Sequence, residues 1–165
     1  MIFPVLKANA YGPGMIPVAE SSQAAGAAGF CVAILDEALA LRRANYTEPI
    51  LVLGITQPTE IELVIANQIS ITVGSLEWLQ AAYEIAQQIP YPQPMHIHLS
   101  VDSGMGRIGF RDATELLAAA TFIKAHAKYF DLEGIFTHFA TADDPDDTYF
   151  KEQSARFNEL VAVLP

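Results

Sequence analysis

The sequence is poor in cysteine and has no long hydrophobic run. Its single cysteine, Cys31, cannot form an internal disulfide, which suits a reducing cytoplasm. The longest apolar run, Ala24–Leu35, is too short and too rich in glycine and alanine to span a bilayer. Met1 is followed by apolar residues without a basic segment, so we expect no signal peptide. These absences predict a cytoplasmic protein that does not enter a membrane.

Basic residues are also scarce. Lysine and arginine together number 9 against 19 aspartates and glutamates, so the formal net charge is −10. Phosphate binding needs clustered basic side chains, and this balance therefore argues against nucleic acid as a partner. An apolar content of 52% excludes a disordered chain. The 165 residues suffice for one ordinary domain or for part of a larger one.

Short apolar runs rich in β-formers alternate with longer helical patterns along the chain. This periodicity predicts strands over residues 3–6, 30–35, 50–53, 70–73, 95–101 and 132–139. It predicts helices over residues 16–28, 36–43, 58–68, 76–89, 112–128 and 147–164. Ser75 is the expected N-cap of the fourth helix, and residues 90–94 read as a stiff proline-rich connector.

This alternation favours a parallel α/β sheet, either a (β/α)₈ barrel or a doubly wound sheet. No dinucleotide fingerprint follows the first predicted strand, and no phosphate-loop lysine motif occurs. Polar residues instead gather at the carboxyl ends of the strands, where barrel enzymes build their sites. Six strand–helix units are two short of a closed barrel, which typically needs about 250 residues. We therefore predict a partial TIM (β/α)₈ barrel with about six of its eight units.

Lys7 is the first residue that suggests chemistry. It alternates in phase with Phe3 and Val5 and so shares a side with two apolar groups. It is either a lysine just past the strand end that extends into solvent, or a desolvated amine that can form a Schiff base. The tight loop with Gly12 and Gly14 favours a nearby ligand, and the hydroxyl of Tyr11 can meet a phosphate oxygen.

Two further segments carry candidate side chains. Residues 101–110 (VDSGMGRIGF) place Arg107 in a glycine-rich turn, where a guanidinium can orient a phenolate, carboxylate or phosphate. A simple surface cation is the alternative. His138 ends the sixth predicted strand and is either a satisfied core histidine or a ring that stacks on a planar ligand.

Metal ligation is a weaker possibility. His96 and His98 share a face of the fifth predicted strand and such a pair can bind zinc, but it lies at the beginning of the strand, away from the expected active mouth. The aspartates at 143, 144, 146 and 147 read as a solvated loop and helix start rather than a divalent-cation site. We therefore expect no metal.

Taken together, these motifs resemble the N-terminal part of bacterial alanine racemases. Residues 5–12 (VLKANAYG) resemble the lysine motif of that family, which binds pyridoxal 5′-phosphate (PLP). Residues 102–109 (DSGMGRIG) and 137–143 (THFATAD) resemble two further family segments, and residues 36–42 give a less specific match. The resemblance runs in order along nearly the whole chain.

The resemblance implies an isomerase that interconverts L-alanine and D-alanine for peptidoglycan synthesis. Family members combine a PLP-binding barrel with a C-terminal β domain and act as head-to-tail homodimers. Residues 1–165 would then be an incomplete N-terminal barrel domain, without the last barrel units and the β domain. The implied partners are the small-molecule substrate and a second copy of the chain.

The resemblance also assigns roles to single residues. Lys7 would bind PLP covalently and act as the base on one face of the substrate carbon. Tyr11 would contact the cofactor phosphate, and His138 would lie against the pyridine ring. Arg107 would contact the phenolic oxygen of the cofactor and the region of the substrate carboxylate.

The sequence departs from the family pattern at two positions. Pro13 stands where many members have histidine, and Ser100 stands where several have a carbamylated lysine that supports the arginine. The arginine that pairs with the pyridine nitrogen, most of the phosphate cradle and the opposite-face tyrosine would all lie beyond residue 165. Two alternatives stay open. One is a non-catalytic, truncated PLP-binding fragment; the other is a different PLP barrel enzyme, such as a serine or broad-specificity racemase or a decarboxylase.

Overall fold

A parallel sheet forms the centre of the computed structural model, which describes residues 1–90 and 93–164. Its five strands lie side by side in the order in which they occur in the chain. Each pairs in parallel with the next, in the sequence β1 (Phe30–Val32), β2 (Ile50–Ile55), β3 (Ser70–Val73), β4 (Met95–Val101) and β5 (Phe130–Thr137).

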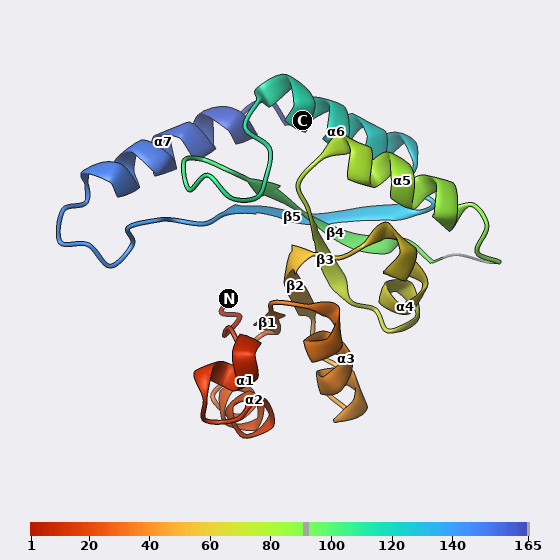
Figure 1. Ribbon diagram of the computed structural model, residues 1–165, viewed down its shortest axis with the longest axis vertical. Helices are drawn as coiled ribbons and strands as arrows, with labels where there is room; N and C mark the ends of the chain where they lie inside the picture. Colours follow the sequence, from red (N-terminus) through yellow and green to blue (C-terminus); the bar gives the residue numbers. More distant parts are fainter. Residues whose placement is uncertain (91–92, 165) are drawn as a thin grey trace.

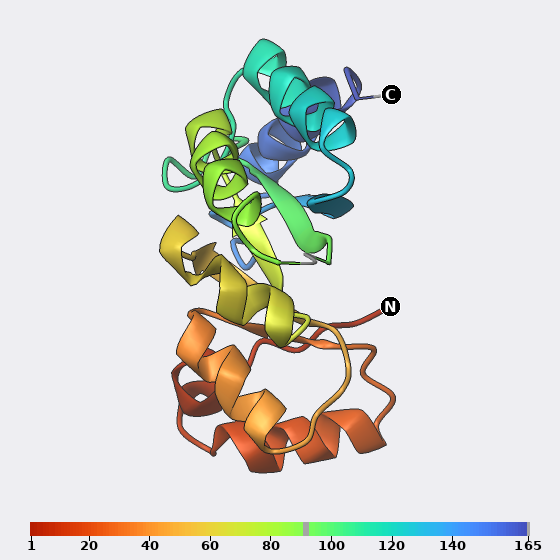
Figure 2. The ribbon, with the colours of Figure 1, turned by 90° about the vertical axis from the view of Figure 1, so that its right-hand side faces the viewer.

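Two helices precede the first strand, and the others alternate with or follow the strands. The helices are α1 (Lys7–Tyr11), α2 (Met15–Ala24), α3 (Leu35–Arg43), α4 (Ile61–Ala66), α5 (Leu76–Ala86), α6 (Ala113–Ala125) and α7 (Thr148–Val161), with the 3₁₀ turn η1 (Pro58–Glu60) before α4. Figure 1 shows α5, α6 and α7 on one side of strands β4 and β5. Figure 2 shows the N-terminal elements, in red and orange, at one end of the molecule and α6 and α7 at the other. Among the described residues, no helix is both long and apolar enough to cross a membrane.

The period of two along β4 decides which side chains enter the core. Met95, Ile97 and Leu99 are buried in the main hydrophobic cluster, together with residues from the helices. His96 and His98, which alternate with them, point to the other face of the sheet and stay half-buried. The polar residues of the strand therefore share the face away from the helices.

Side-chain caps explain where two helices begin. The Ser75 hydroxyl accepts a hydrogen bond from the Trp78 N–H at 3.3 Å, as predicted for the start of α5. The carboxylate of Asp112 accepts from Thr114 N–H at 2.9 Å and from Glu115 N–H at 3.0 Å, which fixes the start of α6.

The strand order distinguishes a (β/α)₈ barrel from a doubly wound sheet, the two alternatives that the sequence left open. In a doubly wound sheet the order reverses at a switch point, and ligands bind there. Here the order β1-β2-β3-β4-β5 does not reverse. The chain is thus an α/β structure with five parallel strands wound in one direction, as in part of a barrel.

The strand predicted over residues 3–6 is wrong as a full strand. Only Val5 pairs, in an isolated parallel bridge with Cys31. Leu6 N–H donates to Cys31 O at 2.7 Å, and Cys31 N–H donates to Pro4 O at 2.9 Å. The segment is too short for a ladder because Pro4 has no N–H and the backbone turns sharply from Ala8 onward.

Other predicted boundaries shift by a few residues. The strand over 30–35 ends at Val32, since Leu35 already begins α3. The helix over 58–68 is divided into η1 and α4, and the last helix is confirmed in a shorter form. The connector predicted over residues 90–94 lies partly outside the described residues, at 91 and 92.

Arg42 joins two strand–helix units. Its guanidinium donates to four backbone carbonyl oxygens, each at 2.8 Å, those of Tyr46, Glu48, Asn67 and Gln68. Partial burial lowers the pKa of Arg42, and the Glu48 carboxylate opposes that shift. The arginine thus holds the loop before β2 against the turn before β3.

Arg42→Met should lower the free energy of unfolding by about 2 kcal/mol, because four carbonyl groups lose a charged donor. Urea unfolding followed by the fluorescence of the buried Trp78 measures this change. Arg43→Met, at the exposed neighbouring position, is the matched control and should change the stability by less than about 0.5 kcal/mol. Equal effects of the two variants would contradict the role given to Arg42.

Candidate active site

The segment that follows Lys7 is a left-handed turn. Ala8, Asn9, Ala10 and Tyr11 have φ values of 51°, 56°, 54° and 60°. Left-handed backbone disfavours residues with a Cβ by roughly 1–2 kcal/mol each, and such strain persists only where surrounding contacts hold it. The turn at Lys7 therefore needs specific partners elsewhere in the chain.

Glu37 supplies the main long-range partner of this turn. Its Oε1 accepts a hydrogen bond from Ala8 N–H at 2.8 Å. Its Oε2 accepts from Ala33 N–H at 2.7 Å and from Ile34 N–H at 3.3 Å. One carboxylate thus ties the residue after Lys7 to the loop between β1 and α3.

Asn9 ties the other end of the turn to α2. Its Oδ1 accepts from Met15 N–H at 2.8 Å, and its carbonyl oxygen accepts from Gly12 N–H at 3.1 Å and Gly14 N–H at 3.0 Å. The tight loop expected around Pro13 is present. The backbone after Lys7 is thereby held at Ala8 and Asn9, and the backbone before it is held by Leu6 N–H, which donates to Cys31 O.

Asp102 organises the glycine-rich turn after β4. Its Oδ1 accepts from Gly104 N–H at 3.1 Å and Gly106 N–H at 2.8 Å. Its Oδ2 accepts two bonds from Arg111, from Nε at 2.9 Å and Nη2 at 2.8 Å. Burial alone would raise the pKa of this carboxyl, but the bonds from Gly106, Arg111 and Gly104 outweigh burial and lower it.

The same turn packs tightly against β4. Gly109 has φ +124°, and a Cβ there would lie 2.6 Å from the carbonyl oxygen of Ser100, so only glycine fits. The Ser100 hydroxyl donates to Ile108 O at 3.3 Å. Ser100 therefore holds the backbone of the turn that carries Arg107.

Lys7, Arg107 and His138 line one pocket of about 70 Å³ at the carboxyl ends of the strands. Ser100 and Asp102 add polar groups, and the remaining lining is apolar, from Leu53, Val101, Met105, Ile108 and Phe136. Lys7 is half-buried, whereas Arg107 and His138 are exposed. The structure thus brings three of the four predicted site residues together on an open wall.

The charges around His138 act on its imidazole. Partial burial, then the positive charges of Arg107 and Lys7, lower the pKa of His138. The ring is therefore neutral at neutral pH, which suits contact with a flat ligand more than a role as a cation.

Tyr11 lies outside this pocket. Its side chain is 67% exposed, and the centre of its ring is 5.9 Å from Lys7 Nζ. The contact of Tyr11 with a phosphate stays a prediction, because the described residues do not enclose its hydroxyl.

The predicted histidine pair lies at the other end of the strands. His96 Nδ1 lies 3.2 Å from both Asp131 Oδ2 and Glu133 Oε1, and the three side chains form a group that offers metal-ligand atoms. His98 Nε2 contacts Glu133 Oε2 at 3.5 Å. Hydrogen bonding between imidazole and carboxylate accounts for these distances, and none of the three histidine-cluster residues lines the pocket with Lys7.

The aspartates after β5 make local contacts in the loop that leads into α7 and in the first turn of that helix. Asp144 Oδ1 accepts from Asp146 N–H at 3.0 Å, and Asp146 Oδ1 accepts from Thr148 N–H at 3.0 Å. Asp147 forms an ion pair with Lys151 at 2.8 Å. These contacts agree with the predicted solvated loop and helix start.

Sequence reasoning missed the side chains that hold the site. Glu37 lies in the segment over residues 36–42, which gave only the less specific match, and no motif included Gln153 on α7. Gln153 is 1% exposed. Nothing in the residue pattern of α7 marks Gln153, because glutamine is common among polar helix residues and its burial is visible only in the structure.

Comparison with known proteins places this geometry in a family. The family described as alanine racemase, N-terminal domain, matches this sequence over residues 1–165, the whole chain. The chain belongs to the alanine racemase family. The alanine racemase of Latilactobacillus sakei subsp. sakei (strain 23K) is 81% identical over all 165 residues, which make up 43% of that protein.

Solved structures of the family agree with the fold. The alanine racemase from E. faecalis superposes with a TM-score of 0.93 at 45% identity, over 99% of this chain and 43% of that one. The histidine racemase from Leuconostoc mesenteroides subsp. sake NBRC 102480 gives the same TM-score at 37% identity, with the same coverage. The chain therefore spans less than half the length of these relatives.

Glu37→Gln should loosen the left-handed turn, because an amide NH₂ would then face backbone N–H donors on at least one side. We expect hydrogen exchange of the Ala8 amide to become about tenfold faster and the protein to lose about 1–2 kcal/mol of stability. Asp36→Asn, exposed in the same helical turn, is the matched control. An unchanged exchange rate at Ala8 would contradict the anchoring role.

Asp102→Asn tests the glycine-rich turn through its pH dependence. Because the folded-state pKa of Asp102 is lowered, its stabilising contribution is present above the unfolded pKa of about 3.9 and is lost as the pH falls further. We expect the variant to be less stable by about 2 kcal/mol at neutral pH, with the difference shrinking below about pH 4. Urea unfolding from acid to neutral pH measures it, with the exposed Asp143→Asn as control. A difference independent of pH would refute this account.

Proposed function

We propose that the protein to which this chain belongs is a PLP-dependent alanine racemase that interconverts L-alanine and D-alanine for peptidoglycan synthesis. The observation that carries the proposal is the convergence of Lys7, Arg107 and His138 on one pocket. The 81% identity to an alanine racemase supports alanine as the substrate over histidine, since the histidine racemase is 37% identical.

The residues of the pocket fit PLP in their chemistry. A lysine amine can condense with its aldehyde, a guanidinium can bind its phenolic oxygen, and a neutral imidazole can lie on its ring. The pocket of about 70 Å³ is smaller than the roughly 300–1,000 Å³ of typical ligand sites. Residues 1–165 therefore provide one wall of the proposed site, and we expect the rest to come from the remaining length of the protein.

The proposed reaction removes a proton from one face of the substrate α-carbon and adds a proton to the opposite face. PLP, when bound, supplies a conjugated ring that takes up the electrons left on that carbon. Lys7 Nζ accepts the proton on its face in one direction of the reaction and donates one there in the reverse direction. The tied backbone at Ala8 limits where Nζ can lie. Racemisation also needs an acid–base group on the opposite face, which we assign to the part of the protein beyond this chain.

Arg107, His138 and Tyr11 are proposed as binding residues. The guanidinium of Arg107 balances negative charge on the cofactor oxygen and near the substrate carboxylate, without taking part as a base. His138 stays neutral beside two cations and packs on the ring. Tyr11 is proposed to contact the phosphate. Because its side chain is exposed, other parts of the protein must cover it to complete this contact.

We further propose that residues 1–165 form the first part of a (β/α)₈ barrel, followed by a C-terminal β domain, in a cytoplasmic homodimer. The unreversed strand order supports the barrel, and the bridge at Val5 adds a sixth parallel segment outside β1. Only the first residue of β5, Phe130, is buried, whereas β3 is buried throughout. β5 therefore exposes surface that a further barrel strand would cover.

A second candidate is a non-catalytic role for the 165-residue chain by itself. The exposed edge and the small, open pocket favour it for the isolated chain, whereas the family favours racemase activity for the longer protein. A non-catalytic isolated chain is compatible with racemase activity in the longer protein.

Lys7→Ala should abolish attachment of the cofactor in the protein as its gene encodes it. Incubation with PLP, reduction with borohydride and mass mapping should find the label on the peptide that contains Lys7, and none in the variant. Lys128→Ala, remote in sequence, is the control and should keep the label and the conversion of L-alanine to D-alanine. A label on Lys124, Lys128 or Lys151 in the unaltered protein would refute the assignment.

A further inference from the structure

Helix α7 is held by apolar packing and by polar contacts. Leu160 is buried and Phe157 packs against the core, while the Phe150 ring lies 4.5 Å from that of Phe139, centre to centre. The buried polar side chain of this helix is that of Gln153. Its directional hydrogen bonds add a constraint that apolar packing does not supply.

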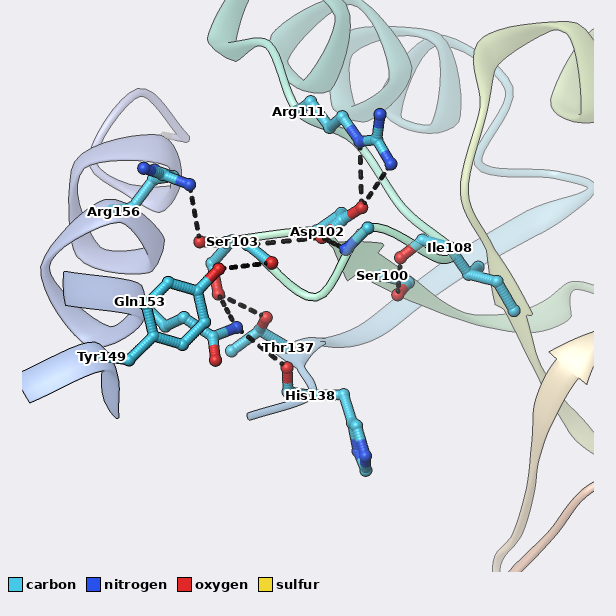
Figure 3. A network of polar contacts seen from close by, with 12 residues as sticks. Ser100, Asp102, Ser103, Ile108, Arg111, Thr137, His138, Tyr149, Gln153 and Arg156 are labelled. Atoms are coloured by element: carbon cyan, nitrogen blue, oxygen red, sulfur yellow. Dashed lines mark hydrogen bonds and ion pairs between the residues drawn. The ribbon is translucent and has the colours of Figure 1, made fainter. Parts of the chain in front are cut away.

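The carboxamide of Gln153 makes hydrogen bonds at both of its ends (Figure 3). Its Oε1 accepts from Ala140 N–H at 2.8 Å. Its Nε2 donates to His138 O at 3.2 Å and to Ser103 Oγ at 3.4 Å. At 1% exposure, this amide has no access to water as a substitute partner.

These partners belong to two different loops. Ser103 lies in the glycine-rich turn that carries Arg107, and His138 and Ala140 lie in the segment after β5. Ser103 Oγ also lies 2.8 Å from Thr137 Oγ1, which joins the glycine-rich turn to the end of β5. Gln153 therefore contacts both sides of the junction between the candidate binding groups.

Two neighbours on the same face of α7 support this contact, as Figure 3 shows. Tyr149 Oη donates to Gly104 O at 2.6 Å, and Arg156 Nη1 donates to Ser103 O at 3.1 Å. Tyr149, Gln153 and Arg156 are spaced by four and three residues and so share one helix face. Gly104 has φ +148°, and a Cβ there would lie 2.8 Å from Tyr149 Oη, so this approach requires glycine.

We propose that Gln153 is a positioning residue, whose buried carboxamide holds the Arg107 turn and the His138 segment in one relative arrangement. The proposal rests on the proposed function, because it gives Gln153 a role through Arg107 and His138. Arg107 and His138 line the same pocket, and partial burial followed by the charge of Arg107 lowers the pKa of His138. The hydrogen bonds of Gln153, which we call the clamp, keep the relative position of the Arg107 turn and the His138 segment constant while a ligand binds and dissociates.

The test compares Gln153→Met and Gln153→Glu in the protein as its gene encodes it. Methionine keeps the length of the side chain and removes all three hydrogen bonds. Glutamate keeps an acceptor for Ala140 N–H but presents a second oxygen to the carbonyl of His138. Asn158→Leu, which removes an exposed amide from the same helix, is the matched control.

Two readouts are needed, amide hydrogen exchange and steady-state kinetics. We expect exchange over residues 102–110 and 137–143 to become about tenfold faster in both variants, with strands β1 to β3 unchanged. We expect kcat/KM for alanine to fall about tenfold or more, while Asn158→Leu changes neither quantity. In Gln153→Glu, acidification protonates the carboxylate, which can then donate a hydrogen bond to His138 O again. The exchange rate of this variant divided by that of the unaltered protein should therefore decrease as the pH is lowered.

Unchanged exchange in the two loops would overturn the proposal, and so would equal acceleration in every strand, which indicates a general loss of stability. Faster loop exchange with unaltered kinetics would also overturn it. Should Gln153→Met fail to fold, the pH dependence of Gln153→Glu decides the matter alone. Absence of racemisation in the unaltered protein would instead refute the proposed function, while the exchange data still report on the clamp.

Discussion

The candidate site depends on pairing the backbone N–H groups of turns that are neither helix nor strand. Side-chain oxygens accept hydrogen bonds from these N–H groups and so fix the course of each turn. Glu37 serves the left-handed turn after Lys7, and Asp102 serves the glycine-rich turn before Arg107. Glu37 and Asp102 thus position the backbone beside Lys7 and Arg107 through hydrogen bonds from main-chain N–H groups.

The sheet explains why these turns meet. Parallel strands wound in one direction bring all their carboxyl ends to one edge, so loops far apart in the sequence become neighbours. Lys7 and His138 are separated by most of the chain and still line one pocket. The open edge at β5 and the 43% coverage of the relatives agree with a wall that other parts of the protein complete.

Much of the fold was predictable because local patterns encode it. The period of two over Met95–Val101 and the short segment Ser70–Val73 with its β-branched residues predicted strands with the observed bounds. The N-cap at Ser75 was also found correctly. The strand expected over residues 3–6 failed, since its pairing ends at Leu6 where the left-handed turn follows, and nothing in four ordinary residues announces positive φ.

By itself, the sequence determined the order of the elements, the alternation of faces along β4, and the place of Arg107 and His138 after two strands. These depend on spacing and on residue type, which are local properties. Only the tertiary structure decided which side chains hold those groups in place. The contacts of Glu37 with Ala8 and of Gln153 with His138 join residues 29 and 15 positions apart, and hydrogen bonds to backbone groups leave no periodic trace in a sequence.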